Sequence, residues 1–169
     1  MTPPIRRVLV PTDFSPESDA ALALAKTIAA GYGASLLLLH VFEEIGGVFA
    51  GDAYAPLPPE TRAALLKDAR ARLTHRLSPE ERTRFRATAD VIVGASAPKI
   101  IDYASQQHVD LIVMGTHGRT GMAHLLMGSI AERVVRLAPC PVLTVHHNHT
   151  VARESRRSRV PDFPAGIPA

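Results

Sequence analysis

Short apolar runs recur along this chain, and each is followed by a stretch with helical character. The clearest run is 36–39, four consecutive leucines that are too few for a confident helix. Continuous apolar runs of this length are typical of strands that are buried on both faces of a sheet. Because strands that alternate with helices imply a parallel sheet joined by right-handed crossovers, the pattern predicts an α/β domain.

The predicted elements follow this alternation along most of the chain. Strands are expected at 6–11, 34–41, 85–93, 110–114 and 142–145. Helices are expected at 16–32, 59–77 and 99–108 and from residue 129 onward, with a short extra turn at 78–81 and with packing faces formed by Ala21, Leu24, Ala25 and Ile28 and by Ala64, Leu65, Ala69 and Leu73. Segment 43–59 is rich in Gly and Pro and is predicted to be a long loop. Strand 85–93 alternates charged or polar residues with apolar ones, which indicates a place near the sheet edge.

The composition limits the classes of protein to which the chain could belong. With 169 residues, it fits one domain that buries roughly two thirds of its unfolded surface. The net charge of +3 lies largely in the arginine-rich end after Asn148, and no basic stripe with interleaved aromatics precedes it, so nucleic acid is not an expected partner. The single Cys140 excludes an intrachain disulfide and fits a reducing compartment. Since no apolar run approaches the roughly 20 residues of a membrane span, we expect a cytoplasmic protein that does not bind membranes.

The segment 114–121 joins a short apolar run to a helical run and is rich in glycine. Gly115 and Gly118 are separated by two residues, and nine further residues lead to Gly128 and Ser129. Glycines and a helix N-terminus present backbone amides and a positive dipole end without side chains in the way. The spacing is neither G-x-G-x-x-G nor a phosphate loop with its lysine. The segment therefore predicts an anion site of a different kind.

Three separated motifs resemble the universal stress proteins that bind ATP. The glycine pattern resembles their nucleotide signature, 8–15 (VLVPTDFS) resembles their first strand with its adenosine-contacting aspartate, and 138–145 (APCPVLTV) resembles their closing strand. The resemblance covers about 6–145 and implies an open, doubly wound, Rossmann-like sheet of strand order 3-2-1-4-5. It also implies that the ligand is ATP, with or without Mg²⁺, in the crevice where the strand order reverses. A homodimer through Val142–Val145 is implied too, since pairing would cover an apolar sheet edge.

The same resemblance predicts which residues form an adenine-nucleotide site. Asp13 is expected to accept hydrogen bonds from a ribose hydroxyl or a base amino group, although it could instead cap the first helix. Val41 and Met114 are suited to flank an adenine ring, while His117 and Arg119 are candidates for contact with phosphate. The complete predicted set is Pro11, Thr12, Asp13, Val41, Met114, Gly115, His117, Gly118, Arg119, Gly128, Ser129 and Ile130.

The motifs leave three functions open. The first is a nucleotide-dependent regulatory module of the stress response, formed by residues 1–146 and followed by a disordered tail at 147–169. The second is an enzyme that hydrolyses ATP or phosphorylates itself, but the glycine segment contains no acidic residue to serve as a base. The third is a dimeric scaffold without a ligand. No catalytic triad or zinc spacing is visible, and the histidines at 146, 147 and 149 are not expected to bind metal, because neighbouring side chains on an extended chain point apart.

Overall fold

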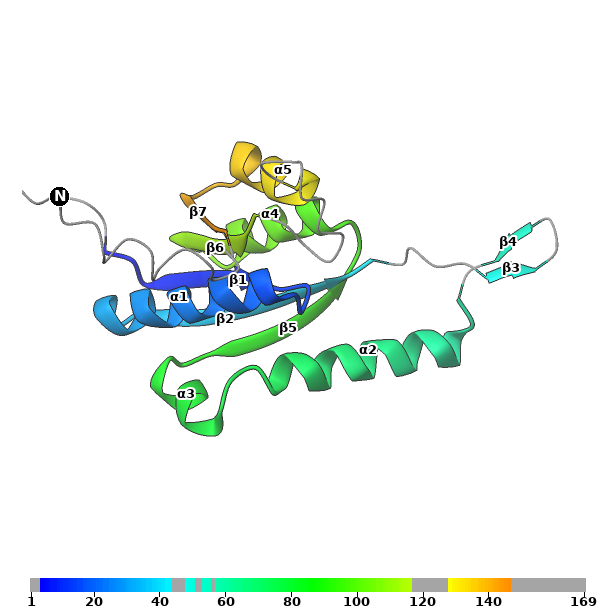
Figure 1. Cartoon of the computed structure of the whole chain (residues 1–169), viewed down its shortest axis with the longest axis horizontal. Helices are drawn as coiled ribbons and strands as arrows, with labels where there is room; N and C mark the ends of the chain where they lie inside the picture. Colours follow the sequence, from blue (N-terminus) through cyan, green and yellow to red (C-terminus); the bar gives the residue numbers. More distant parts are fainter. Residues whose placement is uncertain (1–3, 44–47, 51–52, 56, 117–127, 147–169) are drawn as a thin grey trace, which may run out of the picture.

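The sheet is parallel and has the strand order that the resemblance implied. The computed structural model describes residues 4–43, 48–50, 53–55, 57–116 and 128–146. Five strands form the sheet in the order β5-β2-β1-β6-β7 (Figure 1), which is 3-2-1-4-5 when these strands are numbered along the chain. Their bounds are β1 (Arg7–Pro11), β2 (Ser35–Phe42), β5 (Thr88–Val93), β6 (Leu111–Gly115) and β7 (Val142–Val145). The predicted fold class is therefore confirmed.

Helices cover both faces of the sheet and enclose two separate apolar cores. The helices are α1 (Pro16–Tyr32), α2 (Pro59–Thr74), α3 (Pro79–Arg84), α4 (Ser96–Gln106) and α5 (Ser129–Leu137). Because successive strand residues face opposite sides, Val8 and Val10 join the core under α1 and α2, whereas Leu9 joins the core under α4 and α5. The four leucines of β2 are all buried, as predicted for a strand that is covered on both faces.

Strand β5 lies at one edge of the sheet, as its alternating sequence indicated. It begins at Thr88, three residues later than predicted, because Phe85 ends α3 by donating its N–H to the Glu81 carbonyl oxygen. Helix α4 begins at Ser96, earlier than predicted, since Pro98 lies within its first turn, where a missing N–H breaks no helical hydrogen bond.

The long loop predicted at 43–59 is not entirely irregular. Short strands β3 (Val48–Ala50) and β4 (Ala53–Ala55) pair antiparallel, with Phe49 opposite Tyr54. Figure 1 shows this pair extending away from the main sheet. Val, Phe and Tyr favour strands, so the sequence carried a signal that the prevalence of Gly and Pro obscured.

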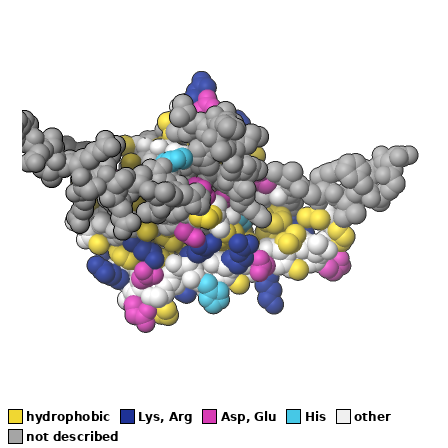
Figure 2. All heavy atoms as spheres, viewed as in Figure 1, with side chains coloured by type: hydrophobic (Ala, Val, Ile, Leu, Met, Phe, Trp, Pro, Cys, Tyr) yellow, Lys and Arg dark blue, Asp and Glu magenta, His cyan; other side chains and the backbone are white. Residues whose placement is uncertain are grey.

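Three of the predicted packing positions are exposed. Leu24 on α1 is 37% exposed, and the neighbouring Leu22 is buried in its place. On α2, Ala64 and Leu65 lie at the surface, while Ala69 and Leu73 are buried as predicted. Only the C-terminal half of α2 therefore packs on the sheet. Figure 2 shows basic and acidic side chains interspersed over the described part of the face in view.

Candidate functional site

A cavity of about 550 Å³ lies at the carboxyl ends of the central strands. Strands β2 and β6 flank β1 there, which is where the strand order reverses and where open α/β sheets bind ligands. Every described member of the predicted set lines the cavity, namely Pro11, Thr12, Asp13, Val41, Met114, Gly115, Gly128, Ser129 and Ile130. The remaining members, His117, Gly118 and Arg119, lie outside the described residues.

Asp13 is fixed by the residue that caps α1. Its Oδ1 accepts hydrogen bonds from the Ser15 amide (3.1 Å) and from the Ser15 hydroxyl (2.6 Å). The Ser15 Oγ in turn accepts from the Ser18 amide (3.3 Å), so Ser15 is the N-cap of α1. The alternative role of Asp13 as the cap of this helix is therefore filled by Ser15, and the Asp13 carboxylate lines the cavity instead.

Thr12 is buried beneath the same loop and is bonded to protein groups on several sides. Its amide donates to the Leu39 carbonyl oxygen (2.8 Å), and its own carbonyl oxygen accepts from the Nδ1 of His40 (2.8 Å). Its hydroxyl accepts from the Phe14 amide (3.0 Å) and shares a hydrogen bond with the Ser18 hydroxyl (2.9 Å). Thr12 therefore forms the cavity wall through a fixed backbone.

Two apolar side chains lie on either side of β1 at the cavity. Val41 belongs to β2 and Met114 to β6, and both are buried in the core beneath α4 and α5 while also lining the cavity. Because one strand separates them, they give the cavity two apolar walls, and a flat ring could lie between these walls.

Three helices begin at the cavity, but their first turns are capped differently. The first turn of α1 is capped by Ser15, and at α4 the Ser96 amide donates to the Glu43 carboxylate (2.6 Å). Helix α5 begins after Gly128, which has no side chain to act as a cap. The Gly128 φ of −70° is ordinary, so this glycine is not needed for a positive φ. At α5, the first-turn amides and the positive dipole end therefore meet the cavity with no side chain on the N-cap residue to cap them.

Sequence reasoning missed several residues that line the cavity. Glu43 was assigned to a loop, although an acid directly after a buried strand was an available signal. Thr116 follows Gly115 and links two elements, since its amide donates to the Val145 carbonyl oxygen (3.0 Å) and its carbonyl oxygen accepts from the Gly128 amide (2.8 Å). His40 was not in the predicted set, but it lines the cavity, and its ring centroid lies 4.4 Å from that of Phe14.

Ionisable groups away from the cavity have structural surroundings. Burial, with a contribution from the Asp110 carboxylate, raises the pKa of the Cys140 thiol, so this cysteine is a poor nucleophile. Burial and the hydrogen bond that Tyr103 donates to Asp90 (2.5 Å) raise the pKa of Tyr103. This hydrogen bond also links α4 to β5. Among the described residues, no group of three or more His, Cys, Asp or Glu side chains is arranged to hold a metal ion.

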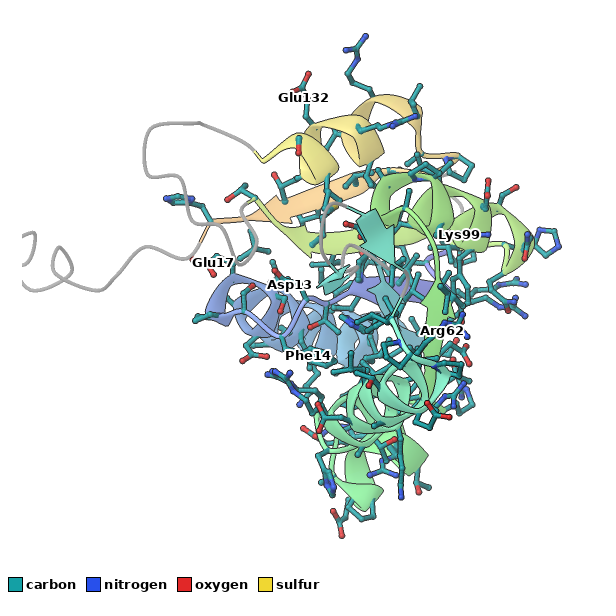
Figure 3. The ribbon with its side chains drawn as sticks, turned by 90° about the vertical axis from the view of Figure 1, so that its right-hand side faces the viewer. Asp13, Phe14, Glu17, Arg62, Lys99 and Glu132 are labelled. Carbon is teal, nitrogen blue, oxygen red and sulfur yellow. The ribbon has the colours of Figure 1, made fainter. Side chains whose placement is uncertain are left out.

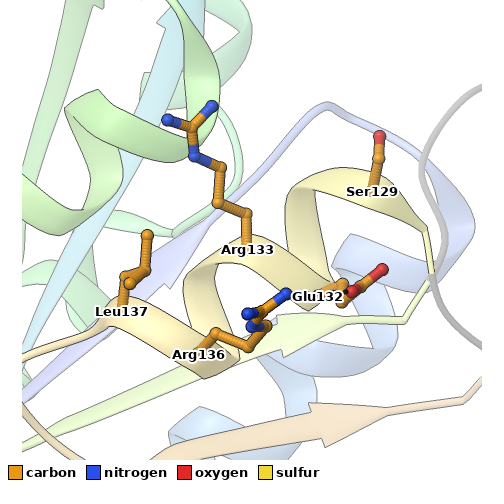
Figure 4. Close-up of a pocket in the computed structure, with 5 residues that line it drawn as sticks. All are labelled: Ser129, Glu132, Arg133, Arg136 and Leu137. Carbon is orange, nitrogen blue, oxygen red and sulfur yellow. Dashed lines mark ion pairs between the residues drawn. The ribbon is translucent and has the colours of Figure 1, made fainter.

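A second, smaller hollow lies on the outer surface of α5. It measures about 350 Å³ and is lined by Ser129, Glu132, Arg133, Arg136 and Leu137. Figure 4 shows that these side chains all project from α5. Because it is bounded by one helix and shares only Ser129 with the predicted set, the hollow is not the predicted site.

The fold and the cavity together define a doubly wound α/β protein with a ligand crevice at its switch point. The family model of the universal stress protein family matches residues 4–146. The chain therefore belongs to the universal stress protein family, as the sequence motifs predicted.

Relatives and solved structures agree with this assignment over most of the chain. A universal stress protein of Thermus aquaticus is 34% identical over 149 residues, which cover 83% of this chain and 98% of the relative. Universal stress protein MJ0577 of Methanocaldococcus jannaschii is 26% identical over 157 residues, covering 86% and 97%. The solved structure of MJ0577 aligns with a TM-score of 0.73 at 25% identity, covering 88% and 100%. A universal stress protein solved in complex with cAMP aligns with a TM-score of 0.61 at 26% identity, covering 86% and 100%. No helix within the described part of the chain has the length and apolar character that crossing a membrane requires.

Proposed function

We propose that the cavity binds an adenine nucleotide, ATP, and that the protein is a nucleotide-dependent regulatory module of the stress response in the cytoplasm. The observation that carries the proposal is the meeting, in one cavity, of Asp13 after β1, Val41 at the end of β2 and the glycine-capped start of α5. These parts lie far apart in sequence, and a structural role for each does not account for their convergence. A family member solved with cAMP supports an adenine nucleotide as the class of ligand.

Each part of the cavity then has a distinct role. Val41 and Met114 flank the adenine ring, and Asp13 accepts a hydrogen bond from the ribose or the base. Gly115 and Gly128 let the backbone approach the phosphates, which accept hydrogen bonds from the α5 amides and the Ser129 hydroxyl. Ile130, Pro11 and Thr12 complete the wall, and His117, Gly118 and Arg119 are assigned to the phosphates by the signature.

The capping of the three helices supports one orientation of the ligand. The Glu43 carboxylate already occupies the start of α4, and a second anion beside it would be repelled. At the start of α5 the N-cap residue is Gly128, which has no side chain and places no carboxylate there. The triphosphate therefore lies toward α5, and the adenosine lies toward β2 and α4.

A regulatory role fits the cavity better than a catalytic one. Its described carboxylates are Asp13 and Glu43, and each accepts hydrogen bonds from protein amides. Mg²⁺ usually keeps several waters and binds through phosphates with one or two carboxylates, which this cavity could supply. The ion would neutralise part of the phosphate charge.

The exposed edge of β7 supports a dimer as the regulated assembly. This strand ends the sheet opposite β5, and Leu143 on it is 37% exposed. Pairing of Val142–Val145 with a second copy would cover both the apolar side chains and the unpaired backbone groups of an edge strand. We propose that nucleotide binding alters this dimer or its binding to other proteins.

The test begins with the nucleotide that copurifies with the protein. Protein is denatured, and the released nucleotide is identified by chromatography and mass spectrometry. The emptied protein is then titrated with ATP, AMP and cyclic AMP, with and without Mg²⁺, by calorimetry. Copurified or tightly binding ATP is expected. If no adenine nucleotide binds, the proposal is overturned and a scaffold without ligand remains, whereas release of ADP during the titration would favour the enzymatic alternative.

A pair of glycine variants makes the test specific for the cavity. Gly128→Glu places a carboxylate at the proposed phosphate site and is expected to abolish binding. Gly31→Glu adds the same charge at an exposed position of α1, where a Cβ would meet no atom within 4 Å, and is expected to bind ATP like the native protein. Equal affinities of the two variants would contradict the proposed location.

A further inference from the structure

Phe14, the residue directly after Asp13, has an unusual backbone conformation. Its φ is +66°, in the left-handed region that bulky side chains rarely adopt. Such a conformation persists only where the surrounding structure holds it. Local interactions must therefore hold the conformation of this loop, which lies immediately beside a residue of the cavity.

Contacts on all sides of Phe14 hold it in place. The guanidinium of Arg72 lies over its ring, with Cζ 4.2 Å from the ring centroid, and the His40 ring lies 4.4 Å away. The Phe14 amide donates to the Thr12 hydroxyl (3.0 Å), and its carbonyl oxygen accepts from the Nη2 of Arg76 (3.3 Å).

The arginines connect this loop to α2, which does not line the cavity. Arg72 lies in the last turn of α2, and Arg76 follows the helix. Arg76 also forms an ion pair with Asp19 of α1, and its Cζ lies 5.4 Å from the Phe14 ring centroid. Figure 3 shows Asp13 and Phe14 beside one another where α1 begins. Asp13 lines the cavity, while the Phe14 ring contacts the α2 segment.

We infer that Phe14, held by Arg72, Arg76 and His40, is a positioning residue that fixes the Asp13 carboxylate for the nucleotide. Helix α2 thereby contributes to affinity without touching the ligand. The inference rests on the proposed function, because it assigns a device to the same cavity. A Phe at positive φ flips the direction of the chain between Asp13 and Ser15, so loss of its contacts would free both the carboxylate and the Ser15 groups that hold it.

The chain supplies a matched control for the arginine–aromatic contact. Arg84 lies over the ring of Phe85, with Cζ 5.3 Å from the centroid. Phe85 is buried and does not line the cavity. If these contacts serve only stability, Arg72→Met and Arg84→Met will each lower the melting temperature and leave ATP affinity alone.

The experiment measures the Kd of ATP and the melting temperature for these variants of the full chain. Arg72→Met is expected to weaken ATP binding roughly fivefold, which corresponds to the usual strength of a cation–π contact, and Arg84→Met to change it less than about twofold. Phe14→Leu is expected to weaken ATP binding roughly tenfold. Phe14→Tyr, which retains the aromatic ring, is expected to bind ATP like the native protein. Unchanged affinity in both Arg72→Met and Phe14→Leu would overturn the inference.

A double-variant cycle tests whether Phe14 acts through Asp13. In an Asp13→Asn background, Phe14→Leu is expected to change the Kd less than about twofold, because the group that it positions is already altered. Inorganic tripolyphosphate, which lacks the adenosine that Asp13 would contact, is expected to compete equally well in native protein and Phe14→Leu. Additive effects in the cycle, or equal weakening of tripolyphosphate, would show a general structural role and overturn the inference. Native protein that binds no adenine nucleotide would overturn the proposed function and the inference together.

Discussion

The two sides of the cavity are built in opposite ways. The β1–α1 loop (residues 12–15) is held by side-chain hydrogen bonds, an aromatic contact and a helix cap before any ligand arrives. The start of α5 (residues 128–131) has a glycine as its N-cap residue, which offers no side chain to cap the helix. A carboxylate held in one position is suited to selecting a ligand by its geometry. Helix amides whose N-cap residue has no side chain are suited to binding a negatively charged group. Under the proposed function, recognition of the ligand and binding of its charge would lie on opposite sides of the cavity.

The largest effect is expected from giving α5 the kind of side-chain cap that α1 has, which would remove the difference between the two helix starts. Gly128 has φ −70° and ψ 151°, values that Asp adopts readily as an N-cap. Gly128→Asp is expected to raise stability by a few tenths of a kcal/mol and to weaken ATP about a hundredfold, because its carboxylate takes the phosphate position. Thermal denaturation and calorimetry measure the two effects.

Gly128→Ser is the control for this change, since it adds a neutral cap. It should stabilise the protein similarly and weaken ATP much less than Gly128→Asp. If both variants bind ATP like the native protein, phosphate does not lie at the start of α5.

The opposite change removes the cap from the β1–α1 loop. Ser15→Ala deletes the side-chain N-cap of α1 and the hydrogen bond that the Ser15 hydroxyl donates to Asp13, while the bond from the backbone amide of residue 15 can remain. Stability is expected to fall by about 1 kcal/mol, and ATP affinity roughly fivefold, since Asp13 loses one of its two hydrogen bonds from Ser15. Urea unfolding gives the stability.

Ser78→Ala is the matched control, because Ser78 caps α3 with its side chain and is not among the cavity residues. It should lose similar stability and retain its ATP affinity. A parallel loss of affinity in both variants would mean that the cap affects binding only through global stability.

A smaller effect is expected at Glu43, the cap of α4. Glu43→Gln keeps an oxygen that can accept from the Ser96 amide but removes the negative charge. We expect ATP to bind about twofold more tightly and AMP to change less, because the repulsion acts on phosphate charge. Glu60→Gln, in the exposed first turn of α2, controls for net charge. Weaker ATP binding in Glu43→Gln would show that Glu43 contacts the nucleotide instead of directing it.

The smallest effect concerns a contact remote from both sides of the cavity. The hydrogen bond from Lys26 lowers the pKa of Glu81 below its usual 4.5, and the amide of Ser78 adds to the shift. The folded state therefore gains stability above pH 4.5 that is lost as pH falls through the lowered pKa of the folded protein. Because the pair is partly exposed, Glu81→Gln should cost only about 0.5 kcal/mol at pH 7 and nothing near pH 2. Urea unfolding between pH 2 and 7 measures this, and ATP affinity at pH 7 should not change.

The sequence predicted the sheet because its strands carry strong local signals. Runs such as 8–10 and 36–39 are buried on both faces, so nearly every residue in them is apolar. The strand order came from the family resemblance, since periodicity cannot say which strands are neighbours. The α2 stripe was partly wrong because the first two turns of that helix contact little of the sheet, and apolar periodicity assumes contact along the whole helix.

Cavity residues that belong to a recognisable sequence motif were predicted. Cavity residues whose role depends only on three-dimensional contacts were missed. Asp13 and Gly128 belong to recognisable patterns. Glu43 is important because it reaches Ser96, which lies 53 residues later in the chain. Phe14 was predicted only as part of the 8–15 motif, and nothing in its local sequence shows that Arg72 would lie over its ring.

The central position of β1 has a practical consequence for hydrogen exchange. This strand pairs with β2 on one side and with β6 on the other, and Val8, Leu9 and Val10 are fully buried. Its amides should exchange with deuterated water only when the whole domain unfolds. A ligand that binds only the folded state lowers the equilibrium constant for unfolding by the factor 1 + [L]/Kd, and the exchange rate falls with it. The deuterium uptake of three central residues would therefore report nucleotide affinity without any label on the ligand.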